Sequence, residues 1–181
     1  AAPRLERAIQ RSITLAEATL KYGRSETPLP NLRSLAFKPA LDEAVAEGTA
    51  GWPGVQFRVV CGEDVQVMAD DDHLHRIITN LVRNAAKAIT SRPAGSDTGL
   101  VVAEAKRSGN QIKLTIGDNG PGVPKAVLAK LFQPFSKAGS DGGTGLGLAI
   151  ARELARGMGG DLELVASSSA GSTFSLTLLA G

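Results

Sequence analysis

The chain has 181 residues, of which 43% are hydrophobic and 21% charged, a composition typical of one globular domain with a short appendage. Its 20 basic and 18 acidic side chains leave a formal charge of +2, too small to indicate nucleic acid or an anionic membrane surface as a partner. The single Cys61 excludes an internal disulfide, and no apolar run approaches the roughly 20 residues that span a bilayer. We therefore expect a soluble domain in a reducing compartment, the cytoplasm.

An amphipathic helix is predicted over residues 4–22, followed by Gly23 as a stop signal. Its apolar positions recur at helical spacing: Leu5, Ile9, Ile13, Ala16 and Leu20. The pattern fits two interpretations equally, a helix that packs on its own domain and one helix of an intermolecular bundle. The next segment is rich in proline and turn formers, which predicts a linker over residues 25–34 with a boundary near Pro30.

The rest of the chain mixes helical and strand patterns without strict alternation. Apolar periodicity predicts helices over residues 39–50, 70–89, 123–131 and 146–158, strands over 34–37, 55–60, 65–69, 161–166 and 172–179, and a hairpin over 99–120. Such an order is typical of an α+β fold with one layer of helices on one sheet.

Glycines cluster in "DGGTGLGLAIA", residues 141–151, directly before a predicted helix. A glycine-rich segment that leads into a helix exposes backbone N–H groups without intrahelical partners, and the helix dipole adds partial positive charge there. The segment therefore fits an anion cradle, and it fits a flexible surface loop equally well. It contains no Walker A motif and does not begin a dinucleotide-binding unit.

A second cluster, "DNGPGV", follows the strand pattern that ends at Asp118. A carboxylate fixed there could accept a hydrogen bond from the exocyclic amine of adenine, while Gly120 and Gly122 let a flat ring approach the backbone. An ordinary Asx turn explains the same residues.

Three polar residues, Asn80, Asn84 and Lys87, share one face of the predicted helix 70–89. Asparagine is a poor helix former, so two on one face require an explanation. Asn84 could offer an oxygen to Mg²⁺, and Lys87 could bind a phosphate as a point charge. A solvated polar stripe remains the alternative, chiefly for Lys87.

Four segments in this order, "NLVRNAAKAI", "DNGPGV", "LFQPF" and "GGTGLGLAI", resemble the N, G1, F and G2 boxes of the catalytic and ATP-binding domain of sensor histidine kinases. The resemblance extends over about residues 70–178. It implies the Bergerat fold, a two-layer α/β sandwich with helices on one face of a mixed sheet, and ATP and Mg²⁺ as cofactors. It also implies that residues 35–181 form the catalytic domain and residues 1–24 the second helix of a truncated dimerisation hairpin.

The resemblance assigns site residues by position. Asn84 would bind Mg²⁺, Lys87 a phosphate and Asp118 the adenine amine. Other nucleotide contacts would come from Gly120, Gly122, Gly143, Thr144, Gly145, Leu146, Gly147, Leu148 and Ser172. A lid over residues 133–142 would be anchored by Phe132 and Phe135, which also fit plain core aromatics. Lys137 is the candidate for the γ-phosphate, although a solvated lysine fits equally well.

The position of Asn80 separates branches of this fold. Relatives that hydrolyse ATP with water carry a glutamate general base there, one helical turn before the magnesium asparagine. An amide cannot accept a proton from water as a carboxylate does, so transfer to a protein histidine is favoured over hydrolysis. The catalytic residues would then be Asn80, Asn84 and Lys87, acting by positioning and charge neutralisation.

Two departures from the family pattern affect the expected partners. The family's phosphoacceptor motif has no counterpart, and the only histidines, His73 and His75, fit surface or capping positions on the helix 70–89. Ala88 replaces a residue that is often aromatic. We therefore expect a phosphoacceptor histidine in a hairpin outside this chain, relay to a response-regulator receiver domain, and a homodimeric parent kinase, with or without an inner-membrane anchor, of which this chain is a monomeric piece. Two alternatives stay open, an anti-sigma-factor serine kinase and a scaffold relative that does not use ATP.

Overall fold

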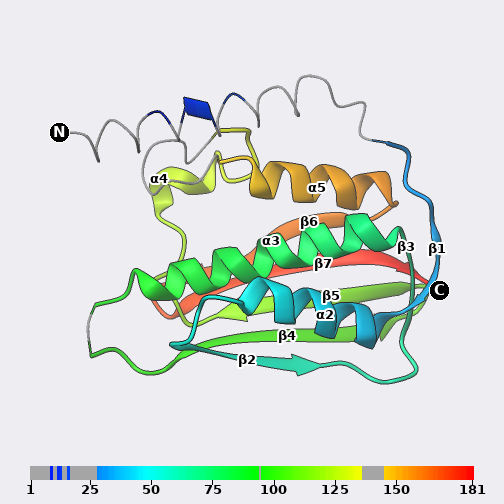
Figure 1. The fold of residues 1–181 in the computed structure, drawn as a ribbon, viewed down its shortest axis with the longest axis horizontal. Helices are drawn as coiled ribbons and strands as arrows, with labels where there is room; N and C mark the ends of the chain where they lie inside the picture. The colour runs from blue at the N-terminus through cyan, green and yellow to red at the C-terminus, as the bar shows by residue number, and fades with distance from the viewer. Residues whose placement is uncertain (1–8, 10–11, 14–15, 17–27, 94, 136–144) are drawn as a thin grey trace.

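The computed structural model describes residues 9, 12, 13, 16, 28–93, 95–135 and 145–181 (Figure 1). Its described strands form one seven-stranded sheet in the order β1-β3-β7-β5-β4-β2, with β6 beside β7. Only the pair β2 and β4 is parallel among these strands, so the sheet is mixed. The bounds are β1 (Arg33–Ala36), β2 (Val55–Val60), β3 (Gln66–Ala69), β4 (Gly99–Ser108), β5 (Gln111–Asp118), β6 (Asp161–Ser168) and β7 (Gly171–Ala180).

The main helices cover one face of this sheet (Figure 1). They are α2 (Phe37–Thr49), α3 (Asp71–Thr90) and α5 (Gly147–Gly157), and a single-turn helix, α4 (Lys125–Leu128), precedes α5 in the chain. The predicted α+β architecture is confirmed, with helices in one layer and strands in the other.

The core lies between the two layers. α3 contributes an unbroken buried stripe, as its 3.6-residue periodicity predicts: Leu74, Ile77, Ile78, Leu81, Val82, Ala85 and Ile89. The hairpin of β4 and β5 presents alternate residues to this stripe, all almost fully buried: Val101, Ala103, Ala105, Ile112, Leu114 and Ile116. Burial of these side chains fixes the position of α3 over the sheet.

α3 and α5 pack against each other and run antiparallel. At one end the Asp70 N–H, which precedes α3, donates to the sulfur of Met158, which follows α5, at 3.3 Å. At the other end Gly147, the first residue of α5, faces Asn80, whose Oδ1 would lie 3.5 Å from a Cβ at Gly147. The last ten residues of α3 therefore continue beyond the start of α5.

The region after the Asp118 turn differs from the predicted helix over 123–131. Only α4 is helical there, with Pro124 at its N-cap, and the chain then continues through i→i−3 bonds, from Lys130 N–H to Val127 O at 3.0 Å and from Gln133 N–H to Lys130 O at 3.0 Å. These i→i−3 bonds form 3₁₀-type turns, which occur in short runs and do not continue an α-helix. The helix predicted from apolar periodicity is therefore too long.

At the N-terminus, the described residues Ile9, Ser12, Ile13 and Ala16 are helical and exposed. The two isoleucines expose 51% and 46% of their surface. Among the described helices, none combines the length and apolarity needed to cross a membrane.

Candidate nucleotide site

The first part of the candidate site is the carboxylate at the end of β5. Asp118 is paired with Ser172 of β7 in the sheet register. Its carboxylate accepts the Gly120 N–H at 2.8 Å and the backbone N–H of Ser172. Burial raises the pKa of Asp118 above its ordinary value, and the two hydrogen bonds oppose this shift. The structure thus holds a half-buried carboxylate in a fixed orientation, as a reader of a ligand amine requires.

The glycines that follow Asp118 are required by close approaches. A Cβ at Gly120 would lie 3.2 Å from the Cβ of Ala88 on α3. Gly122 has φ +81°, and a Cβ there would overlap the carbonyl oxygen of Ser168. The absence of side chains therefore lets this turn pack against both α3 and the β6–β7 hairpin.

Hydrogen bonds from three neighbouring segments fix the same turn. The Asn119 side chain accepts the Leu100 N–H at 2.8 Å and donates to Thr98 O at 2.9 Å. Arg92 donates from Nη1 to the Asn119 carbonyl at 3.2 Å. On the opposite side the Val123 N–H donates to Ser167 Oγ at 2.8 Å. Sequence reasoning assigned no role to the three side chains that make these bonds: Arg92, Asn119 and Ser167.

The second part of the site is the polar face of α3. Asn80 and Asn84 are half-buried, whereas Lys87 is exposed. Asn80 lies opposite Gly147 at the start of α5, and Ala88 lies opposite Gly120. The face of α3 from Asn80 to Ala88 therefore extends from one glycine cluster to the other. Eight residues of α-helix span about 12 Å. All three predicted polar residues thus lie along one path that connects the two glycine clusters.

The third part is the start of α5. Gly145 has φ +70°, a conformation that favours glycine, and Gly147 begins the helix. The N-cap residue Leu146 carries an apolar side chain, so this residue provides no side-chain acceptor for the first-turn N–H groups. Leu146 and Leu148 are both buried, so a ligand would meet their backbone and not their side chains.

Of the predicted lid, residues 133–142, the structure describes only residues 133–135. Phe132 is half-buried, and its ring meets that of Phe174 edge-on at 6.4 Å between centroids. Phe135 has φ +61°, a left-handed conformation that is unusual for an aromatic residue. The remaining predicted contacts in this region lie outside the described residues: Lys137, Gly143 and Thr144.

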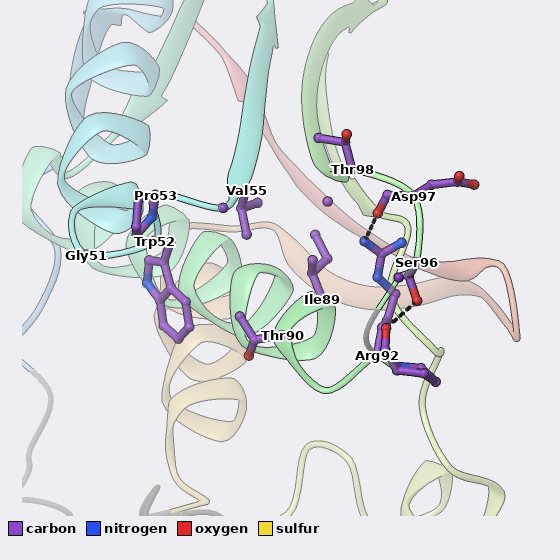
Figure 2. Close-up of a pocket in the computed structure, with 14 residues that line it drawn as sticks. Gly51, Trp52, Pro53, Val55, Ile89, Thr90, Arg92, Ser96, Asp97 and Thr98 are labelled. Carbon is purple, nitrogen blue, oxygen red and sulfur yellow. Dashed lines mark hydrogen bonds between the residues drawn. The ribbon is translucent and has the colours of Figure 1, made fainter.

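A separate pocket of about 640 Å³ opens between the α2–β2 turn and the loop after α3 (Figure 2). Val55, Ile89, Trp52 and Thr90 are among the residues that line it. None of the residues predicted to bind nucleotide lines it. Two of its lining residues bond to the site described above: Arg92 donates to the Asn119 carbonyl, and the Thr98 carbonyl accepts from the Asn119 side chain. The polar path along α3, on which the predicted residues lie, therefore stays the candidate nucleotide site.

Comparison with known proteins identifies the family and the fold. A model of the histidine kinase-, DNA gyrase B- and HSP90-like ATPases matches residues 69–181. Sensor protein TorS of Escherichia coli K12 is 37% identical over 113 residues, 62% of this chain and 12% of TorS. The histidine-protein kinase BarA of the same strain is 32% identical over 182 aligned positions, 94% of this chain and 20% of BarA. The chain thus spans at most a fifth of the length of these two relatives.

A solved structure shares the fold. The mycobacterial sensor histidine kinase MprB superposes with a TM-score of 0.68 at 25% identity, over 82% of this chain and 98% of the solved one. The ordered boxes, the helix layer on a mixed sheet and these similarities lead to one assignment. This chain belongs to the histidine kinase-, DNA gyrase B- and HSP90-like ATPase family, as an ATP-binding catalytic domain of the sensor histidine kinase type.

Proposed function

We propose that this domain binds Mg²⁺-ATP along the polar face of α3 and transfers the γ-phosphoryl group to a histidine outside the chain. One observation carries the proposal. α3 approaches the turn of residues 118–122, which we call the base-reading turn, at Ala88, and it approaches the start of α5 at Asn80. Both glycine clusters therefore border one face of this helix. Adenine at Asp118 and phosphates at the start of α5 would then lie at opposite ends of this face.

The residues present fit a magnesium ion held jointly with phosphate. Asn84 is half-buried and can offer one amide oxygen, and the described residues contain no cluster of three His, Cys, Asp or Glu side chains that could hold a metal alone. Mg²⁺ commonly takes few protein ligands and keeps waters and phosphate oxygens. When bound, the ion would neutralise phosphate charge, while Lys87 and the amides of Gly145 and Gly147 orient the phosphates.

The acceptor is proposed to lie on another segment. Asn80 occupies the position at which a general base would activate water, and its amide cannot take up that proton. Of the two histidines, His75 bonds the Glu47 carboxylate at 2.6 Å, and His73 lies in the first turn of α3, about 20 Å along the axis from Lys87. This placement supports an acceptor in the dimerisation hairpin of the parent kinase, followed by a response-regulator receiver domain.

The exposed isoleucines of the N-terminal segment support the same assembly. Ile9 and Ile13 are helical and lack burial in this chain. An apolar helix face is commonly buried against another helix. We propose that residues 1–24 pair with a preceding helix and that the parent kinase is a homodimer.

The test combines nucleotide binding with phosphotransfer. Calorimetric titration of this chain with ATP should give binding that weakens when Mg²⁺ is omitted and weakens about 100-fold in Asp118→Ala. Incubation of the wild-type chain with Mg²⁺-ATP and a histidine-bearing hairpin of the same parent should then produce acid-labile phosphohistidine on the hairpin. Acid-stable phosphoserine on a partner protein would instead identify a serine kinase, and absence of ATP binding by a folded chain would refute both.

A further inference from the structure

A cationic side chain covers one of the predicted lid anchors. The Arg152 guanidinium on α5 lies over the ring of Phe132, 4.7 Å from its centroid. The same ring packs edge-on against Phe174 of β7 at 6.4 Å. Phe132 is therefore held between the helix layer and the sheet by an aromatic contact and a cation–π contact.

The position of the guanidinium is fixed by an acidic partner. Arg152 donates from Nε to Asp161 Oδ1 at 3.0 Å and from Nη2 to Oδ2 at 3.3 Å, which is the two-point geometry that planar guanidinium groups favour. The Leu162 N–H donates to the same carboxylate at 2.8 Å. A second cation, Arg156, donates to Asp161 Oδ1 at 3.0 Å. Asp161 thus holds Arg152 in the orientation that it adopts over the ring.

This contact joins two segments that border the nucleotide site. Phe132 lies on the segment that leaves the base-reading turn, next to the buried Leu131. Arg152 lies five residues after Gly147, on the helix whose first residue faces Asn80. A change in the tilt of α5 would move its first N–H groups relative to the polar face of α3.

We infer that Arg152 is a positioning residue for nucleotide binding: it fixes the segment of Phe132 against α5 and so fixes the start of α5 beside Asn80. The inference rests on the proposed function. Arg152 does not touch the bound nucleotide; it acts through the ring and through the helix on which it lies.

A matched pair of variants tests this role. Arg152→Gln and Arg156→Gln each remove a guanidinium that bonds to Asp161, with two hydrogen bonds in the first case and one in the second, but only the first removes the contact with Phe132. Calorimetry with Mg²⁺-ATP should show an affinity loss of about three- to tenfold for Arg152→Gln, the fold-change that a cation–π contact carries, and less than twofold for Arg156→Gln. Arg152→Lys, which keeps a cation near the ring, should restore part of the affinity.

A double variant separates positioning from a general loss of stability. Combined with Phe132→Leu, the Arg152→Gln change should cost no further affinity, because the ring through which it acts is already absent. Equal losses in Arg152→Gln and Arg156→Gln, or additive losses in the double variant, would overturn the inference while wild-type ATP binding stands. Failure of the folded wild-type chain to bind ATP would overturn the proposed function and this inference together.

Discussion

The two ends of the candidate site differ in how firmly the fold holds them. At the base end, the turn after Asp118 is bound by β7, by the loop after α3 and by the β6–β7 hairpin. At the phosphate end, Gly145 and Gly147 lie at the start of a helix, Lys87 is exposed on a helix surface, and a Cβ at Gly147 would meet the Asn80 side chain only at ordinary contact distance. A base is recognised by fixed hydrogen-bond geometry, whereas a phosphoryl group that moves to an acceptor needs access, and this division suits a group-transfer site.

Replacement of one glycine by alanine at each end tests most directly whether the two ends are held with different firmness. Gly122→Ala places a Cβ on the Ser168 carbonyl oxygen at φ +81°, and we expect a loss of about 3 kcal/mol in the free energy of unfolding. Gly147→Ala meets only the Asn80 side chain at 3.5 Å and removes a helical glycine, so we expect stability within about 1 kcal/mol of wild type. Urea unfolding of both variants measures the difference. Equal losses would show that the two ends are held equally firmly.

The next effect concerns base selection. Asp118→Ala should lower ATP affinity by about 100-fold, because a half-buried charged acceptor is lost together with its hydrogen bond. GTP lacks the exocyclic amine at this position, so its weaker binding should change by less than threefold. Competition titrations with both nucleotides measure the ratio. A loss of the same size for GTP would remove the base-reading role from Asp118.

A change at the phosphate end should lower the affinities for ATP and GTP equally, whichever base the nucleotide carries. Asn84→Ala should lower the affinities for ATP and GTP by about tenfold each when Mg²⁺ is present, because one oxygen ligand of the ion is lost. Without Mg²⁺ the variant and the wild type should bind alike. Titrations in magnesium and in a chelator measure this contrast, with Asn80→Ala as the matched asparagine on the same face. Magnesium dependence that survives in Asn84→Ala would contradict the assignment.

The sequence was sufficient to predict those parts of the structure that depend on neighbouring residues in the chain. The buried stripe of α3 follows from helical periodicity, and Gly120 and Gly122 could be identified because a short motif carries their backbone requirement. By contrast, the length of α4 depended on Pro124 and on 3₁₀-type bonds that compete with an apolar pattern. Predicted contacts at Lys137, Gly143 and Thr144 lie outside the described residues and stay predictions.

Contacts between distant residues left no signal in the sequence. Arg92 reaches Asn119 across 27 residues, and Ser167 reaches Val123 across 44. In the sequence alone, Arg92 is indistinguishable from an ordinary loop residue and Ser167 from an ordinary strand residue. The Asn119 side chain bonds to Leu100 and Thr98, 19 and 21 residues away, and the local bonding habit of asparagine in turns does not predict these partners. For Arg92 and Ser167 only the tertiary structure supplies the role.

The smallest expected effect is a contrast in pH dependence between two carboxylates. Hydrogen bonds from Arg152 lower the pKa of Asp161 from 3.8 to about 2, so its contribution to stability is complete above about pH 4 and is lost as the pH falls toward 2. Because its side chain is 35% exposed, solvent screening reduces this contribution to about 1 kcal/mol. Burial raises the pKa of Asp118, so its contribution has the opposite sign: it is present below pH 3.8 and is lost as the pH rises through the raised value.

Urea unfolding between pH 2 and 7 tests this contrast with two isosteric variants. Asp161→Asn should be less stable than wild type at pH 7, and the difference should shrink as the pH falls from about 4 to 2, where about half of the native carboxylate is protonated. Asp118→Asn should be no less stable than wild type at pH 7, because burial makes the ionised carboxylate unfavourable in the folded state. A destabilised Asp118→Asn would mean that its bonds to Gly120 and Ser172 outweigh burial, and the base end would then owe its rigidity to the same charge that reads the nucleotide.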